Sequence, residues 1–100
     1  MIRATTPTHT FNIPIEANKI QEILVTYRQV GRNILEKKNS DMTNDGNAWS
    51  LTLTQQETKL FMADTKVEVQ VRVLTTGGDA LASKIFSVTV DRVLNDEVMA

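Results

Sequence analysis

Cysteine is absent from this chain of 100 residues, which excludes disulfide bonds, thiolate catalysis and zinc sites with cysteine ligands. Aromatic residues and histidine are scarce: there are one tryptophan, one tyrosine, three phenylalanines and one histidine. Basic and acidic residues nearly cancel, at 11 and 12, and leave a net charge of −1. A balanced charge creates no strong field for polyanions, so we expect neither a nucleic-acid nor a membrane partner.

Long hydrophobic runs are also missing. The stretch from Met1 to Pro7 has no apolar segment typical of a signal peptide, and no run elsewhere approaches the length of a membrane span. Hydrophobic residues make up 41% of the chain, which is enough for one core and not for two. We therefore expect a single domain over residues 1–100 that folds in the cytoplasm.

Alternation of apolar and polar residues, the pattern of a half-buried strand, recurs along the chain. Residues 66–74 are the clearest case, because Val67, Val69, Val71 and Val73 alternate with charged or polar residues. The same pattern predicts strands at Thr8–Ile15, which two prolines bracket as an edge strand, and at Ile20–Gln29, Arg32–Lys38 and Trp49–Leu53.

The last alternating segment, Ala80–Leu94, is the longest strand that the pattern predicts. Leu81 breaks its register, so we expect a bulge near Ala82 or Ser83. The buried face of this strand is expected to carry Phe86, Val88 and Val90.

Glycine and polar residues mark the connections. Gly31 and the segment Thr75–Asp79 predict hairpin turns, and Asn39–Asn47 predicts a surface loop with room for a short strand pair around it. Asn95–Ala100 is expected to be a loose tail. Its Val98 and Met99 would then be available at an interface.

One segment organises the rest of the chain. Thr54 is followed at the third position by Glu57, which is the signature of a helix capping box, and Leu60 and Phe61 are expected to fold the short helix onto the core. A strand, a short capped helix and a strand carry the chain from one sheet to another. We therefore predict an all-β fold, an immunoglobulin-like β-sandwich of six to seven strands with one short helix at the corner near residues 55–61.

Several short strings follow one another in a familiar order and spacing: Tyr27-Arg28-Gln29, Leu35-Glu36-Lys37, Leu53-Thr54-Gln55-Gln56-Glu57-Thr58, Phe61, Val69-Gln70-Val71-Arg72, Gly78 and Ala82-Ser83-Lys84-Ile85. From about Phe11 onward, the chain resembles a group of small proteins encoded in bacteriophages and prophages of Gram-positive bacteria. The resemblance implies a phage-derived origin and a role in the virion or in its assembly. It implies no catalytic residues.

Two sites could bind a metal or activate a nucleophile. His9, the single histidine, has no cysteine and no motif-placed serine or carboxylate with it, so we expect a surface or structural role. Residues 41–47 resemble the first half of a calcium loop, with Asp41, Asp45 and Gly46 in suitable positions. The twelfth position is Thr52, where a bidentate glutamate is needed, so we interpret the segment as a polar turn.

Two further features could bind a ligand through charge or stacking. Trp49, the only tryptophan, is expected in the core of a sandwich, with Phe61 and Phe86 near it. A basic cluster on one hairpin is diluted by Glu36 and has only Tyr27 for stacking, so we interpret it as a solvated face. The cluster consists of Arg28, Arg32, Lys37 and Lys38.

Acidic pairs and glycines complete the search for a site. Glu57 with Asp64, or Asp91 with Asp96, could be drawn as acid pairs, but no motif places them at the separation that glycoside hydrolysis requires. The Gly77-Gly78 pair is too short for a phosphate loop. We therefore predict no catalytic, cofactor-binding or metal-binding residues, no cofactor and no enzyme activity.

The main functional hypothesis is a non-catalytic structural or interaction module of phage or prophage origin, in the tail or baseplate of the virion or in its assembly. Its partners would be phage structural proteins, or further copies of the chain joined through edge strands, in the host cytoplasm or in the virion. The alternative is a carbohydrate-binding sandwich that uses the loop Asn39–Asn47 and the turn Thr75–Asp79. Exposed aromatic residues, which sugar sites favour, are few.

Overall fold

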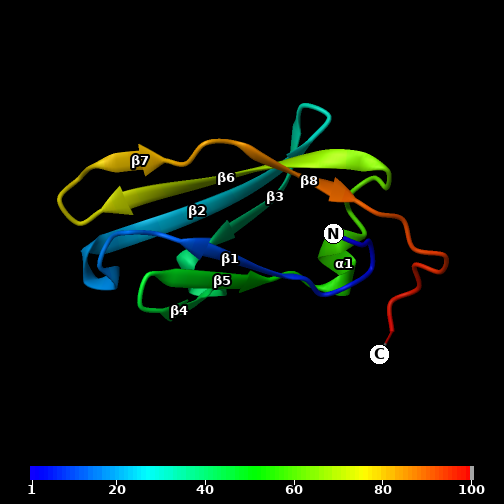
Figure 1. Ribbon diagram of the computed structural model, residues 1–100, viewed down its shortest axis with the longest axis horizontal. Helices are drawn as coiled ribbons and strands as arrows, with labels where there is room; N and C mark the ends of the chain where they lie inside the picture. Colours follow the sequence, from blue (N-terminus) through cyan, green and yellow to red (C-terminus); the bar gives the residue numbers. More distant parts are fainter. Residues whose placement is uncertain (100) are drawn as a thin grey trace.

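The structure, a computed structural model, describes residues 1–99 and shows two antiparallel sheets packed face to face (Figure 1). Ala100, the last residue of the expected tail, lies outside the described residues. The elements in chain order are β1 (Thr8–Asn12), η1 (Ala17–Lys19), β2 (Ile20–Gln29), β3 (Arg32–Lys38), η2 (Asn39–Asp41), β4 (Thr43–Asp45), β5 (Ala48–Thr52), α1 (Gln55–Thr58), β6 (Thr65–Thr75), β7 (Ala80–Ala82) and β8 (Phe86–Val90).

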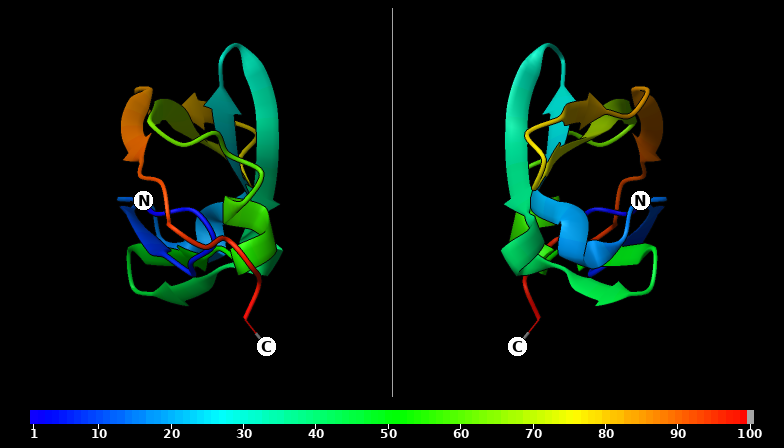
Figure 2. Two further views of the ribbon diagram at one scale, coloured as in Figure 1. Left: turned by 90° about the vertical axis from the view of Figure 1, so that its right-hand side faces the viewer. Right: turned by 90° about the vertical axis from the view of Figure 1, so that its left-hand side faces the viewer.

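The smaller sheet has the order β1-β5-β4, and the larger has the order β3-β2-β6, with β7 and β8 both pairing with the other side of β6. End-on views show the two layers, with α1 at one end of the sandwich and η1 at the other (Figure 2). The all-β sandwich class, with its single short α-helix, is therefore confirmed. The described residues form eight strands, because the loop Asn39–Asn47 contributes β4 and the last predicted strand is divided in two.

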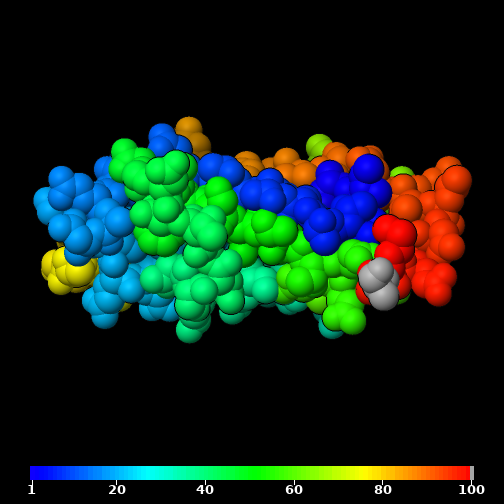
Figure 3. All heavy atoms as spheres, turned by 90° about the horizontal axis from the view of Figure 1, so that it is seen from below, coloured from blue at the N-terminus to red at the C-terminus, as the bar shows by residue number. Residues whose placement is uncertain are grey.

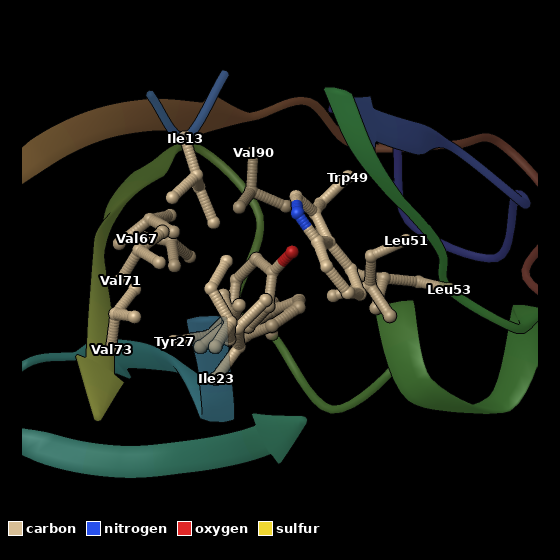
Figure 4. Close-up of a cluster of buried hydrophobic side chains, with 14 residues drawn as sticks. Ile13, Ile23, Tyr27, Trp49, Leu51, Leu53, Val67, Val71, Val73 and Val90 are labelled. Carbon is tan, nitrogen blue, oxygen red and sulfur yellow. The ribbon is translucent and has the colours of Figure 1, made fainter. Parts of the chain in front are cut away.

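The core lies between the sheets and comes from the residues that the alternation predicts (Figure 4). In the larger sheet, Val25 pairs with Val71 and Tyr27 with Val69, so the buried faces of β2 and β6 form one surface. Each fully buried side chain of this size stabilises the fold by about 1.5–3 kcal/mol. The smaller sheet supplies Trp49 and Leu51, with Leu53 just beyond it.

The crossing from β5 to β6 confirms the predicted corner. Thr54 Oγ1 accepts from the Glu57 amide at 3.1 Å, and the Glu57 carboxylate accepts from the Thr54 amide at 2.9 Å. Phe61 is buried, as expected, but Leu60 is 56% exposed. The prediction for Leu60 is wrong because α1 has a single turn, and Thr58 is the helical residue that faces the core.

The prediction of one long strand over Ala80–Leu94 is also wrong. The Ser83 amide donates to the Val71 carbonyl at 2.8 Å, and the Ser83 hydroxyl accepts from the Val71 amide at 3.0 Å. Both backbone groups of Val71 are thereby occupied by one residue. The chain then leaves the sheet before β8 begins, so the expected bulge becomes a gap between two strands.

The tail is held at two points rather than loose. The Gln55 side chain makes two hydrogen bonds with the backbone of Met99, at 2.9 and 2.8 Å, and Arg3 lies 3.4 Å from the Asp96 carboxylate. Seen from the side of the smaller sheet, the dark blue start of the chain lies between the green of β5 and α1 and the orange C-terminal segment (Figure 3). Val98 and Met99 remain partly exposed.

Two hairpin turns are placed as predicted. At the β2–β3 turn, Val30 has φ +51° and Gly31 has φ +71°, the pair of positive φ values that a two-residue type I′ turn requires. Gly31 adopts its value without strain. Val30 is β-branched and is strained there. At the β6–β7 turn, Gly78 has φ +90°, and its amide donates to the Thr75 carbonyl at 3.0 Å.

Candidate functional site

The sandwich is open along one side, where the edge of the smaller sheet faces the edge of the larger one. On that side, within residues 1–99, β1 pairs with β5 and β7 and β8 pair with β6, and the one addition is the bridge of Ile2 to Asp91 just beyond β8, so a gap in the layers runs between β1 and the β7–β8 edge (Figure 1). A groove of about 530 Å³ occupies this side. We call it the open-side groove. It is lined mainly by Phe11, Ile13, Pro14, Val73, Leu81 and Phe86.

The walls of the open-side groove are apolar and partly exposed. Phe86 reaches across from β8 so that its ring lies 6.1 Å from the ring of Phe11 on β1. Leu81 and Phe86 remain 48% and 42% exposed. Phe86 therefore lies on the rim of the groove, and the expectation that it packs in the core near Trp49 is wrong.

The corner at the other end of the molecule is bonded through polar groups. Gln29 is buried, and its side-chain Nε2 donates to the Met62 backbone carbonyl at 2.9 Å while its Oε1 accepts from the Met62 backbone amide at 2.7 Å. Thr58 is fully buried, and its hydroxyl bonds both the amide and the carbonyl of Thr5, at 3.1 and 3.0 Å. Arg3 donates to two further backbone carbonyls of the same segment, those of Lys59 and Phe61. Buried polar groups need such partners, and here each has one.

Glu57 links the corner to β3. Its carboxylate forms an ion pair with the Lys37 ammonium, and both side chains are more than four-fifths covered. Partial burial by itself would raise the pKa of Glu57, but the hydrogen bonds from Lys37 and from the Thr54 amide outweigh it and hold this pKa below its ordinary value. The carboxylate is thus held ionised for a structural purpose.

His9 and Tyr27 form a polar contact between the two sheets. Nδ1 of His9 lies 2.7 Å from the Tyr27 hydroxyl, and the Tyr27 ring lies 5.9 Å from the ring of Phe61. Burial, and then the positive charge of the N-terminal ammonium, lower the pKa of His9. Burial, and then the charge of Glu57, raise the pKa of Tyr27. The contact ties β1 to β2, so His9 has a structural partner.

Trp49 lies in the core, as predicted. Its indole ring points into the space between the sheets from β5 (Figure 4). Within residues 1–99 its buried nitrogen has no hydrogen-bond partner. An unmade hydrogen bond of this kind costs about 1–3 kcal/mol, so packing of the ring must more than offset it.

The segment that resembles half of a calcium loop has a different structure. Residues 43–45 form β4, which pairs with β5. The side-chain amide of Asn44 donates to the Gly46 and Ala48 carbonyls. The Asp41 carboxylate accepts from the Lys38 amide at 3.0 Å. β4 and β5 thus form a hairpin. Because a strand turns alternate side chains to opposite faces, the side chains of residues 43–45 do not converge as they would in a calcium loop. No group of three His, Asp or Glu side chains within residues 1–99 could hold a metal ion.

The basic cluster is not one surface. Lys37 and Lys38 are neighbours on β3 and therefore face opposite sides. Lys37 pairs with Glu57, and Lys38 lies 3.6 Å from the Glu22 carboxylate. Arg28 donates to the carbonyl of the hairpin turn at Gly31. Of the four cluster residues, Arg28, Arg32 and Lys38 are exposed.

The carboxylates drawn as acid pairs have separate partners. Asp96 lies 3.4 Å from Arg3, and Asp91 lies 4.0 Å from the Met1 ammonium. Glu57 is engaged by Lys37 and Thr54, as described above. The Gly77-Gly78 pair forms the β6–β7 hairpin turn.

Within residues 1–99, no helix is long and apolar enough to cross a membrane.

Sequence reasoning therefore missed the open-side groove. Its walls come from three separate segments, around Phe11, Val73 and Phe86, which only the topology brings together. One signal was present, since Leu81 falls out of step with the alternation around it. Comparison of the chain with family models, curated proteins and solved structures gave no match.

Proposed function

We propose that the chain is a non-catalytic structural or interaction module of phage or prophage origin, and that it binds a protein partner through the open-side groove. The groove carries this proposal, because Leu81 and Phe86 leave apolar surface open to solvent in one place. Contiguous exposed apolar surface is typical of protein interaction sites.

The non-catalytic part of the proposal is supported by the hydrogen bonds of three groups. The pKa values of His9, Tyr27 and Glu57 depart from their ordinary values, and such departures are typical of catalytic residues. Here each group is bonded to another element: His9 to Tyr27, and Glu57 to Lys37 and Thr54. A structural purpose accounts for all three.

The resemblance to small phage and prophage proteins supports a place in the virion, in its tail or baseplate, or in an assembly intermediate. The partner is then a phage structural protein or a further copy of the chain. The alternative carbohydrate site gains no support. Tyr27, Trp49 and Phe61 are buried, and neither Asn39–Asn47 nor Thr75–Asp79 contains an aromatic residue on which a sugar ring could stack.

Capture from phage-producing cells tests the proposal. The wild-type chain, Phe86→Ser and the control Leu60→Ser are tagged, and each is purified with its bound proteins while its own size is measured in solution. Leu60 is exposed to a similar degree but lies at the corner. We expect the wild type and Leu60→Ser to retain phage structural proteins or to form oligomers, and Phe86→Ser to lose them. A strict monomer that is absent from virions and from every assembly intermediate would contradict the proposal.

A further inference from the structure

We infer that the open-side groove binds an extended, apolar segment of a partner protein, which pairs as an added strand along the outer edge of β8. This inference rests on the proposed function and specifies the binding mode and the chemistry of the partner. Strand addition of this kind obtains affinity from backbone hydrogen bonds and specificity from pockets for alternate side chains.

The first observation is the side to which the backbone amide and carbonyl groups of β8 point. In an antiparallel pair, successive residues turn their backbone groups to opposite sides. The Val90 carbonyl accepts from the Asp64 amide on the β6 side at 2.7 Å, whereas the Asp91 amide and carbonyl bond Met1 and Arg3 on the other side. Counting back by twos from Asp91, the backbone groups of Ser87 also point away from β6.

The chain itself already adds a strand at the end of this edge. Ile2 forms a parallel bridge with Asp91, and the Met1 nitrogen donates to the Thr89 carbonyl at 2.9 Å. Met1–Arg3 thus covers the outward carbonyl of Thr89 and both outward groups of Asp91. The next outward position, Ser87, is beyond this segment and beside the groove. The same edge is therefore accessible to a second extended segment along its remaining length.

The size of the groove decides between a peptide and a second folded copy. Large aromatic side chains bury about 150–250 Å² each, and a leucine somewhat less, so the exposed fractions of Leu81 and Phe86 leave on the order of 150 Å² of apolar surface. A standard stable interface buries about 800 Å² on each partner. The apolar surface is therefore too small for a dimer face and is suited to a single strand.

The volume of the groove sets the pattern of the bound segment. A cavity of about 150 Å³ holds a benzene-sized group, so a groove of about 530 Å³ has room for roughly three apolar side chains. In a strand, every second side chain points to the same face. The segment should therefore carry apolar residues at three alternate positions. The facing edge, β1, is followed by Pro14, which has no amide to donate, so β8 supplies the backbone bonds.

A library of random 12-residue peptides displayed on filamentous phage is the probe. It is selected against the folded chain, and the enriched peptides are synthesised and titrated by fluorescence anisotropy. Ser87→Pro removes the outward amide at a position where an edge strand tolerates proline, and Ser87→Ala is its control because it keeps that amide. Leu81→Ser removes an apolar wall of the groove, and Leu60→Ser is its control, since the two residues are 48% and 56% exposed.

We expect enriched peptides with apolar residues at alternate positions, and binding that is about tenfold weaker in Ser87→Pro and in Leu81→Ser, as the loss of about 1.4 kcal/mol produces. Both controls should bind like the wild type. In the wild-type chain, bound peptide should slow hydrogen exchange of the Ser87 amide, a readout that does not depend on whether Ser87→Pro folds.

An absence of enriched peptides, apolar residues spaced three or four apart as on a helix, or an unprotected Ser87 amide would each overturn strand addition. The proposed function is judged separately. If Phe86→Ser loses its partner in cells while Ser87→Pro keeps it, the groove is a docking site for another kind of surface. If neither variant loses a partner, both proposals fail.

Discussion

The corner and the open side of this sandwich use opposite means of joining two sheets. At the corner, Gln29, Thr58 and Glu57 each make two or more hydrogen bonds to a segment distant in sequence or to a helix end. On the open side, Phe11 and Phe86 meet across a groove through their rings, and among residues 1–99 the facing edges of β1 and β8 have no further strand beside them except the short Met1–Arg3 segment at one end of β8.

This difference means that the most recognisable part of the sequence is not the part that we propose binds a partner. The string Thr54-Gln55-Gln56-Glu57 is the most distinctive in the sequence, and its polar groups are used within the molecule to cap α1, hold the tail and bind Lys37. Groups that are already bonded have little left to offer a partner. The apolar rim of the groove has exposed surface, and binding can cover it.

The largest expected effect tests how strongly the corner depends on buried polar bonds. In Gln29→Leu, the Met62 backbone amide and carbonyl lose their partner in a partly buried site, and each unpaired group costs about 1–3 kcal/mol. We expect the free energy of unfolding in urea to fall by about 3 kcal/mol. The matched control is Gln70→Leu near the open side, where one exposed bond to the Ser83 carbonyl is lost and the fall should be below about 1 kcal/mol. Equal losses would remove the contrast.

The same contrast explains what the sequence could predict. The alternation of Val67 to Val73 and the capping box of Thr54 and Glu57 are local patterns whose physical meaning does not depend on the rest of the chain. They correctly located β6 and the crossing between sheets, and with the other alternating segments they indicated the fold class.

Features that depend on distant neighbours were predicted wrongly or missed. Ser83 ends the predicted strand because it bonds Val71 twice, and no pattern near Ser83 records the position of Val71. Thr58 is buried and Leu60 exposed, against their hydropathy, because Thr5 supplies bonds to the Thr58 hydroxyl. The groove was missed for the same reason, since Phe11 and Phe86 come together only when both sheets are in place.

A smaller effect is expected from the helix cap. Thr54→Ala deletes the hydroxyl that accepts from the Glu57 amide, and loss of such a cap costs about 1 kcal/mol. The control is Thr10→Ala on β1 beside the groove, where the hydroxyl bonds an exposed Ser50 hydroxyl at 3.0 Å and should contribute less than about 0.5 kcal/mol. Thermal unfolding of the two variants measures the difference. A larger loss for Thr10→Ala would show that the open side is not the weaker-bonded region.

A smaller effect still is expected from pH, through the contact that joins β1 to β2. Because the pKa of His9 is lowered below 6.5 in the folded chain, the unfolded chain binds more protons as pH falls. The contribution of His9 is therefore fully present above pH 6.5 and is lost as pH falls through the folded pKa. Urea unfolding at pH 7.5 and 5.5 should show this loss in the wild type and not in His9→Gln. Both pH values lie above the ordinary pKa of 4.5 for Glu57, so the corner ion pair does not contribute to the difference in stability between them.

The smallest expected effect on stability is also the sharpest test of the comparison. Leu81→Ser and Leu60→Ser remove side chains that are 48% and 56% exposed, one on the open side and one at the corner. Since the area shielded from water is similar, both should change the free energy of unfolding by less than about 0.5 kcal/mol, as surface substitutions usually do. Any difference between them must then come from what each side chain contacts in a complex. If only Leu81→Ser weakens peptide binding and partner capture, the open side is the functional one. Equal weakening by both variants would mean that exposed apolar surface is used without regard to position, and the distinction between corner and groove would no longer hold.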